Sequence, residues 1–335
     1  MEKLFSAFVG VDVSKHTLDV CLLKEQQSNS DVFENNKEGI TKLISWLTAK
    51  SGVSAEAILF CFEYTGIYTM PLCCYLSEHH YQFAIVPALE VIQSMGVKRG
   101  KSDKTDAKAI ARYAQTRSDD ITLYTLPQKA LVKLKFLLSH RNRLVKTRKA
   151  FYVAMTEPAG FLDKEITREI NRHNKQLIDS LDRKIKQTEK QIKELITSDE
   201  EMKKIYELLL SVPGVGNHIA AHLIVHTNCF TTFKSSRKFA CYAGIAPFEH
   251  SSGISIRGKN RVSHLANKRT KALLNMAALA ARKNDEQINQ YYERKLKEGK
   301  NPMLILNNIR NKLVARIFAT VKRKTPYVHT MQFAA

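Results

Sequence analysis

The chain has 335 residues and a formal net charge of +21, from 53 Lys and Arg against 32 Asp and Glu. This length predicts about two domains, and a hydrophobic share of 44% supplies cores for them, which excludes a wholly disordered chain. No apolar run reaches the ~18 residues of a membrane span and no signal-peptide pattern is present, so we expect a cytoplasmic protein without a membrane partner. The six cysteines show no CxxC spacing, which argues against a zinc finger or a disulfide framework. The excess of positive charge favours a polyanionic partner.

The positive charge is concentrated in two blocks. Residues 98–149 hold fifteen Lys and Arg against four acids, and residues 257–324 hold eighteen against four. The rest of the chain carries a net charge of −4. A merely solvated surface would spread its charge more evenly, so the two blocks favour two phosphate-binding faces.

The first third of the chain predicts a mixed sheet covered by helices. Apolar or alternating runs predict strands, and apolar residues at helical spacing predict helices. In chain order the expected elements are strands at 5–13, 18–23 and 31–35, a helix over 37–50, a strand at 57–63, a helix at 68–79, a strand at 82–87, and helices at 89–95 and 103–115. Three hairpin-linked strands followed by alternating strands and helices are typical of an α/β domain, which we place at residues 1–126.

The remainder of the chain predicts helices alone. Leucines at helical spacing, with Lys and Arg between them, predict one basic helix that starts at Pro127 and ends before EPAG at 157–160. Apolar residues three, four or seven apart over 163–196 predict a coiled-coil arm, which either self-associates or packs within its own chain. These two helices make an expected arm domain at 127–200. A last, mostly α domain of several short helices and two glycine-bearing turns is expected at 201–335.

Four carboxylates stand where the predicted fold brings them together. Asp12 and Glu63 each end a buried strand, while Asp103 and Asp106 share one face at the start of a helix. If the first and fourth strands are neighbours, the four groups converge, and hard divalent cations are what usually stabilise such a cluster. Two Mg²⁺ ions about 4 Å apart would then hold a scissile phosphate. Taken singly, each acid is as well explained as a turn or helix cap.

Pro-Gly-Val-Gly at 213–216 separates two helical runs within residues 207–227. The pattern resembles a helix-hairpin-helix, in which Gly214 and Gly216 let backbone N–H groups approach a phosphate. Such a motif grips nucleic acid without reading its sequence. A plain joint between two helices is the alternative.

The segments VGVDVSKHTLDV, FEYTG and GVKRGKSDKTDAKAIARYA resemble the N-terminal half of the DEDD transposases of bacterial insertion sequences. That family includes the Piv-type DNA invertases. The resemblance runs over nearly the whole chain and implies an RNase H-like (RuvC-like) fold for the first domain. The four acids that it implies are Asp12, Glu63, Asp103 and Asp106. It also implies a homotetrameric, dimer-of-dimers complex on donor and target DNA, and a bridge RNA that pairs with both.

Residues 239–283 resemble the C-terminal transposase domain of the same family, in which a serine before a glycine is the nucleophile. The match assigns that role to Ser252, with Ser251 as the alternative, because both precede Gly253. Without the resemblance, Ser-Ser-Gly is only a turn. The expected contacts with nucleic acid are Lys98, Arg99, Lys101, Gly214, Gly216, Arg257, Lys259 and Arg261.

Together these features predict a DNA transposase or site-specific recombinase of the bacterial nucleoid. It would cleave and exchange strands with Mg²⁺ through a serine–DNA covalent link, guided by a bridge RNA. A Piv-type invertase without RNA, and a RuvC-like endonuclease that uses water, are the alternatives. An actin-like sugar kinase is disfavoured because Ser14, Lys15 and His16 stand where that fold uses small residues. A catalytically inactive relative is disfavoured because the four acids and the serine are all present.

Overall fold

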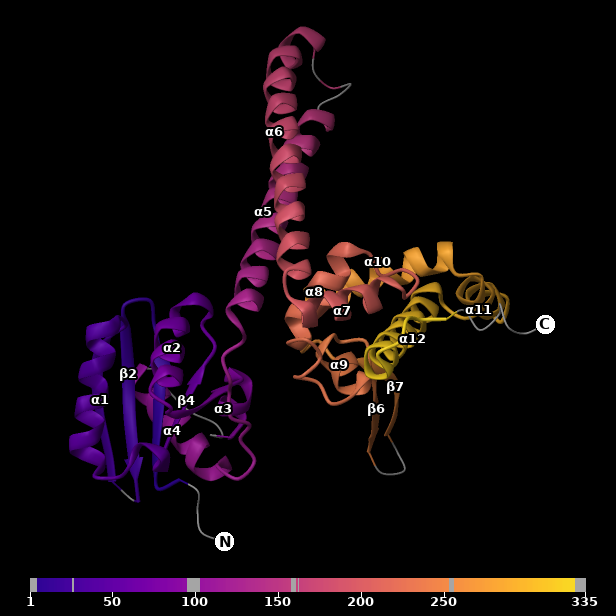
Figure 1. The fold of residues 1–335 in the computed structure, drawn as a ribbon. Helices are drawn as coiled ribbons and strands as arrows, with labels where there is room; N and C mark the ends of the chain where they lie inside the picture. The colour runs from indigo at the N-terminus through magenta and orange to yellow at the C-terminus, as the bar shows by residue number, and fades with distance from the viewer. Residues whose placement is uncertain are drawn as a thin grey trace. The chain divides into compact units, whose positions relative to one another are not determined.

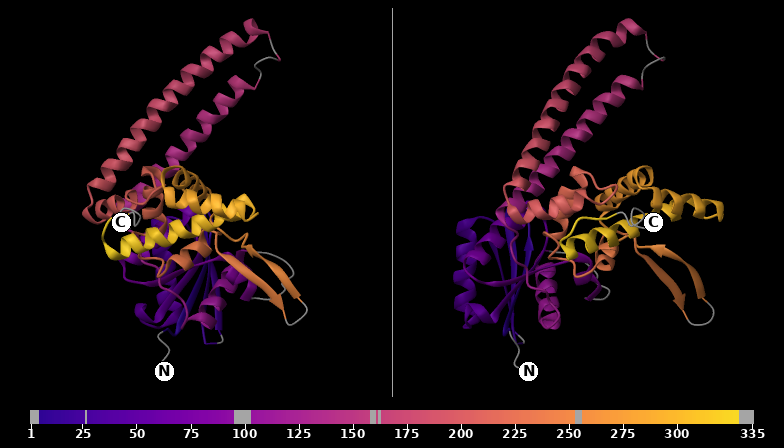
Figure 2. Two further views of the ribbon diagram at one scale, coloured as in Figure 1. Left: turned by 90° about the vertical axis from the view of Figure 1, so that its right-hand side faces the viewer. Right: turned by 45° about the vertical axis from the view of Figure 1, so that its right-hand side comes forward.

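The computed structural model describes residues 5–25, 27–94, 103–157, 161, 163–252 and 256–328. The chain divides into two compact units, Met1–Leu126 and Pro127–Ala335 (Figure 1 and Figure 2). The division falls where we expect the α/β domain to end. The residues expected to form an arm and a last domain belong to one unit.

A five-stranded sheet is the framework of the first unit. Its strand order is β3-β2-β1-β4-β5. The first three strands form antiparallel hairpins, whereas β4 runs parallel to β1 and β5 parallel to β4. The condition for the acids to converge, that the first and fourth strands are neighbours, is therefore met. The strands are β1 (Ala7–Val13), β2 (Thr17–Lys24), β3 (Gln27–Glu34), β4 (Ile58–Glu63) and β5 (Gln82–Val86).

Helices cover both faces of this sheet, because successive side chains of a strand point to opposite faces. Val9 and Val11 of β1 belong to a core that includes residues of α1 (Lys37–Ser51) and α2 (Met70–Glu78). Phe8 belongs to a second core with α3 (Ala88–Ser94) and α4 (Asp103–Arg117). Two short 3₁₀ turns, Ala55–Ala57 and Gly66–Thr69, precede β4 and α2.

The expected elements of the first unit are present, with one difference at β3. This strand begins at Gln27 rather than at residue 31. Its side chains are mostly polar and exposed, so the sequence lacks the apolar alternation that marks a half-buried strand.

Helix α4 packs so closely on the sheet that its backbone touches the backbone of β1. A Cβ built on Gly10 of β1 would lie 2.2 Å from the carbonyl oxygen of Ala107 and 2.3 Å from the nitrogen of Ala111. No side chain fits in that space, so a glycine on the strand and alanines on the helix are what allow the approach. The contact fixes the first turn of α4 with respect to β1.

Two long helices, α5 (Lys129–Thr156) and α6 (Lys164–Thr197), lie side by side as an antiparallel hairpin (Figure 1 and Figure 2). Residues seven apart on α6, namely Ile178, Ile185 and Ile192, are buried. The stripe that the sequence offers for self-association therefore packs in part within its own chain. Ile170 and Leu177 of the same helix stay exposed.

Two ion pairs join α5 to α6. Arg141 lies 2.6 Å from Glu189, and Arg148 lies 2.5 Å from Asp182. Both pairs are partly solvated, so they select the register of the hairpin more than they stabilise it.

The body of the second unit packs its helices around a single core, to which Leu131, Leu134 and Leu138 at the base of α5 also contribute. Several of its helices are short, as expected, whereas α10 and α12 are longer, with 17 and 22 residues. Within the described ranges, no helix is both long enough and apolar enough to span a membrane. The helices are α7 (Glu200–Leu210), α8 (Asn217–Thr227), α9 (Ser236–Tyr242), α10 (Lys268–Asn284), α11 (Glu286–Lys297) and α12 (Pro302–Arg323).

A two-stranded hairpin, β6 (Pro247–Ser252) and β7 (Ile256–Val262), interrupts these helices. The prediction of helices alone after Pro127 is wrong here. Described residues of the hairpin such as Phe248 and Arg261 are exposed. Strands that bury no apolar face leave no alternation in the sequence to predict them from.

Candidate active site

Asp12, one residue before the end of β1, and Glu63, the last residue of β4, lie at the same edge of the sheet on neighbouring parallel strands. Val11 of β1 stands opposite Phe62 of β4, so the next residue along each strand is one of the two acids. Neighbouring strands are about 4.8 Å apart, which brings the two backbones close. Both side chains are partly exposed. Asp12 follows Phe8 and Gly10 at steps of two, and therefore stands on the face that α4 covers.

The first turn of α4 supplies Asp103 and Asp106. The charge of Asp103 acts on Asp19 of β2, which indicates that this turn lies near the acidic edge of the sheet. Asp19 in turn pairs directly with Asp12 across the β1–β2 ladder. Lys104 lines a common pocket with Asp19, which is a second sign that the start of α4 lies beside β2.

Asp19 is a carboxylate at this edge that the sequence analysis does not single out. Burial, followed by the charge of Asp103, raises the pKa of Asp19, while a hydrogen bond from Thr17 acts in the opposite direction. In the alternating segment LDVCLL, Asp19 stands at a polar position, and the pattern alone indicates a side chain that faces solvent. Counting the register back through the short turn after Val13 would have placed it opposite Asp12.

The donor set at this edge suits a hard divalent cation. It offers carboxylate oxygens, which Mg²⁺ and Ca²⁺ prefer, and not the thiolate or imidazole ligands of softer metals. Asp103 and Asp19 repel each other, and a bound cation would relieve that repulsion. Within the ranges that the structure describes, no three His, Cys, Asp or Glu side chains are gathered closely enough to hold an ion as they stand. The predicted contacts Lys98, Arg99 and Lys101 fall in 95–102, outside the described residues.

The two candidate nucleophiles, Ser251 and Ser252, are the last residues of β6. In the hairpin, Ser251 stands opposite Arg257 of β7. Lys259 and the exposed Arg261 follow on the same strand, so the backbone register brings a basic strand alongside the serines. The serines end a strand here, which differs from the simple turn that Ser-Ser-Gly suggests. The description does not extend to the side chains of Ser251, Ser252, Arg257 and Lys259.

The two glycines before α8 have different surroundings. Gly214 has a φ of +86°, and a Cβ there would lie 2.4 Å from the carbonyl oxygen of Ala277 in α10. Close packing against α10 therefore accounts for this glycine. Gly216 is the N-cap of α8, makes no side-chain cap, and has no atom within 4 Å of a built Cβ. Its open helix N-terminus is the part of the motif that a phosphate could approach.

Three histidines follow one another at steps of four along α8. The rings of His222 and His226 are 4.0 Å apart. His222 Nε2 is 2.9 Å from Thr270 Oγ1, and His226 Nδ1 is 2.9 Å from the Tyr242 hydroxyl. Burial, followed by neighbouring positive groups, lowers the pKa of His222 to about 2, and burial first of all lowers that of His218 and His226 to about 4. These neutral rings tie α8 to α9 and α10.

Arg269 of α10 extends this network to the arm. Its guanidinium donates to Asn142 of α5 and lies 3.3 Å from His218 Nε2. Burial, followed by the charge of Arg141, lowers the pKa of Arg269. The sequence analysis does not identify this network, although the spacing of the three histidines is visible in AHLIVHT and the residues before it.

Two family models match the chain. One, described as a transposase of the DEDD and IS110 type, matches residues 9–157. The other, described as the transposase IS116/IS110/IS902 family, matches residues 206–293. The chain belongs to this IS110 transposase family. The first match contains all four candidate acids, and the second contains both serines.

Relatives of this IS110-family transposase include a protein that is named for DNA inversion. The pilin gene-inverting protein of Moraxella bovis is 28% identical over 328 residues, which cover 96% of this chain and 97% of that protein. The protein of the same name from Moraxella lacunata matches to the same extent. A 43.6 kDa protein of insertion element IS110 from Streptomyces coelicolor is 32% identical over 124 residues, 37% of this chain and 30% of that protein.

Proposed function

We propose that this IS110-family transposase cleaves and exchanges DNA strands with its acids around Mg²⁺ and Ser252 as nucleophile. The observation that carries the proposal is the placement of Asp12 and Glu63 at the ends of adjacent parallel strands, on the face that α4 covers. The strand order, with three antiparallel strands followed by two parallel ones, supports an RNase H-like fold.

The proposed reaction replaces one phosphate ester bond of the DNA with a phosphate ester bond to serine. Bound Mg²⁺ supplies charge neutralisation at the scissile phosphate. Ser252 Oγ forms a bond to phosphorus, the bond to the 3′ oxygen breaks, and the serine proton ends on the departing 3′ hydroxyl. A serine hydroxyl is inert unless a neighbouring group activates it, and the basic strand β7, which pairs with β6, is the candidate for that role. Because the link to serine keeps the energy of the broken bond, the 3′ hydroxyl of another strand can reseal it without ATP. The residues that would hold the metal are Asp12, Glu63, Asp103 and Asp106.

Recombination between two plasmids, together with trapping of the covalent adduct, tests this mechanism. We expect Ser252→Ala and Asp12→Ala to lower recombination by at least 10³-fold. Ser251→Ala is the matched control, and we expect it to stay within tenfold of the wild-type protein. Undiminished exchange by Ser252→Ala would rule out the serine mechanism, and an adduct at Ser251 would move the role to that residue. Full activity in excess EDTA would contradict the role of the acids.

A guide RNA and a tetrameric synapse in the bacterial nucleoid complete the proposal. The basic helix α5 and the α5–α6 hairpin, which we propose as a coiled-coil arm, are the candidate holders of the RNA. Sequencing of the RNA that co-purifies with the protein is the test. A discrete structured RNA from the DNA flanking the gene supports guidance, and its absence contradicts guidance.

An invertase that works without RNA is the second candidate. The likeness to the pilin gene-inverting protein over 97% of that protein favours it. Strand exchange by RNA-free protein would establish this candidate. A RuvC-like endonuclease would instead release cut DNA without any covalent adduct.

A further inference from the structure

A pocket of about 540 Å³ lies between α11 and α12 in the second unit. Three cations, two glutamines and one tyrosine line it: Arg294, Lys312, Arg316, Gln287, Gln290 and Tyr291. Among the described residues that line it, none is acidic. The volume is that of a site for a nucleotide-sized group and exceeds what one small ion needs.

Two of the three cations form no ion pair with the carboxylates that the structure describes. Arg316 lies 2.8 Å from the buried Asp285 and donates to Gln287 at 2.6 Å, so helix packing accounts for it. In the described part of the chain, neither Arg294 nor Lys312 forms an ion pair. Their positive charges are therefore available to an anion that enters the pocket.

Tyr291 stands between these cations. Lys312 Nζ is 4.4 Å from the centre of the Tyr291 ring, and Arg294 Cζ is 5.8 Å from it. Tyr291 is half-buried, and a cation over an aromatic ring outside the desolvated core gains about 1 kcal/mol, so both groups can turn to a phosphate at small cost. The amide of Asn308 donates to the Tyr291 hydroxyl at 3.4 Å and helps to orient the ring.

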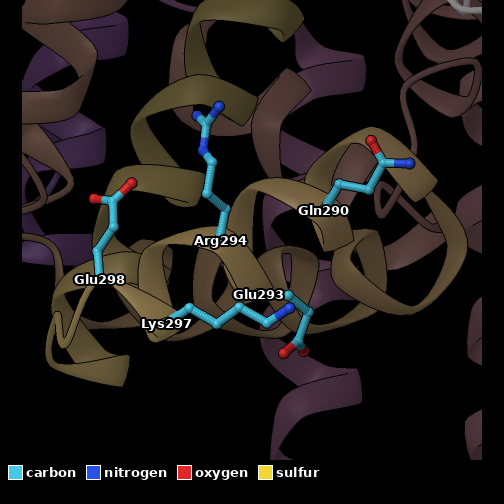
Figure 3. A pocket seen from close by; sticks show the side chains of 5 residues that line it. All are labelled: Gln290, Glu293, Arg294, Lys297 and Glu298. Carbon is cyan, nitrogen blue, oxygen red and sulfur yellow. The ribbon is translucent and has the colours of Figure 1, made fainter.

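The acids nearest to this pocket already have partners. A shallow groove along α11 shares Gln290 and Arg294 with the pocket and also holds two glutamates (Figure 3). Glu293 accepts from Arg282 at 3.0 Å, and Glu298 from Lys295 at 2.6 Å. In Figure 3 the carboxylate of Glu293 points to the opposite side of α11 from the guanidinium of Arg294. The charge of Arg294 also acts on Glu298. The lining of the α11–α12 pocket itself, among the described residues, holds three cations and no carboxylate.

We propose that the α11–α12 pocket binds phosphodiester groups of a nucleic-acid strand, with Arg294 and Lys312 on the phosphates and Tyr291 against a base or sugar. A positive groove combined with an aromatic platform is how proteins hold single strands without reading sequence. The inference rests on the proposed function and adds a contact beyond it. Arg294, Lys312 and Arg316 lie past residue 293, where the second family match ends.

The test uses the full-length protein with Arg294→Gln/Lys312→Gln. Its matched control is Arg237→Gln/Lys238→Gln, which removes two exposed charges from α9 of the same unit, outside the pocket and outside both basic blocks. Affinities are measured against salt concentration for a 30-nucleotide DNA strand, its duplex, and the RNA of the same sequence. We expect the pocket variant to bind at least one probe about tenfold more weakly, with a salt slope smaller by about two. The control should stay within threefold of the wild-type protein.

Tyr291→Leu separates stacking from charge. We expect it to weaken single-strand binding about five- to tenfold with an unchanged salt slope, because stacking releases no counterions. Equal effects of both double variants, or wild-type affinity in the pocket variant for all three probes, would overturn the inference. A wild-type protein that binds no probe would instead overturn the proposed function.

Discussion

Asp12 and Asp19 face each other across a strand pair, yet we assign them different roles. Asp12 lies beside Glu63 and is a proposed metal ligand, whereas Asp19 lies on the far side of Asp12, where burial and then the charge of Asp103 raise its pKa. Like charges directly opposite one another on neighbouring strands destabilise a sheet. The pairing of Asp12 with Asp19 therefore lowers the stability of the folded protein while it concentrates negative charge at this edge of the sheet.

Thermal unfolding with and without Mg²⁺ separates the two aspartates. We expect 10 mM Mg²⁺ to raise the Tm of the wild-type protein and to leave that of Asp12→Asn unchanged, since a bound ion stabilises only the folded state. In EDTA, Asp19→Asn should raise the Tm by about 2–4 °C, because it removes a repulsive neighbour of Asp103. Asp119→Asn, an exposed site after α4, is the control and should change neither value. A magnesium shift that persists in Asp12→Asn would contradict the assignment.

His222 predicts a loss of stability in mild acid. The side chain is 4% exposed, and burial lowers its pKa from the ordinary 6.5 to about 2. Below pH 6.5 the unfolded chain takes up a proton that the folded chain refuses, so stability is present at pH 7 and falls as the pH drops. Between pH 7 and pH 5 this residue accounts for a loss of about 2 kcal/mol.

Urea unfolding at pH 7 and pH 5 measures that loss. His222→Gln removes the titrating group, so its stability should fall less between the two pH values than that of the wild-type protein. The comparison is between slopes, which makes it independent of any destabilisation that glutamine itself causes. Parallel pH curves for the two proteins would show that His222 does not contribute.

The contact between β1 and α4 sets the geometry of the acidic edge at the scale of elements. Gly10→Ala places a Cβ within 2.2 Å of the Ala107 carbonyl oxygen, so α4 must move away from the strand. We expect a loss of about 3 kcal/mol or more, the range of severe overpacking, measured by urea unfolding. Gly52→Ala is the control, since its φ is +61° and nothing lies within 4 Å of a built Cβ. It should cost about 1 kcal/mol from backbone strain alone. Equal losses for the two variants would show that the close approach is not the cause.

The more fully an element is buried, the better the sequence predicts it. The runs around Val9 and Phe60 are apolar because both faces of the sheet are covered, so β1 and β4 are plain in the sequence, as are the acids that end them. Described residues of the β6–β7 hairpin such as Phe248 and Arg261 are exposed, and only a family resemblance draws attention to Ser252. Asp19 and the histidine network depend on register and on long-range packing, which a residue pattern does not contain.

The α5–α6 hairpin is the element through which we expect copies of the chain to associate. Its internal seam of Ile178, Ile185 and Ile192 is satisfied within the chain, while Ile170 and Leu177 are 59% and 45% exposed. Exposed apolar residues on a long hairpin are what a second copy would cover. We therefore expect Ile170→Glu/Leu177→Glu to lower the solution mass from that of a tetramer.

Light scattering after gel filtration measures that mass. Gln176→Glu/Gln187→Glu adds the same charge at exposed polar positions of α6 and should keep the assembly of the wild-type protein. An unchanged mass in the apolar variant would show that the arm does not mediate self-association.

The weak support of the β6–β7 hairpin, which carries Ser252, bears on when DNA cleavage could occur. None of its described side chains belongs to the core of the second unit, and a lone two-stranded hairpin is marginally stable in water. If Ser252 is the nucleophile that we propose, its aim depends on a partner that holds the two strands in place. We then expect the protein alone to leave DNA uncut and to cleave only when a bound partner orders β6 and β7.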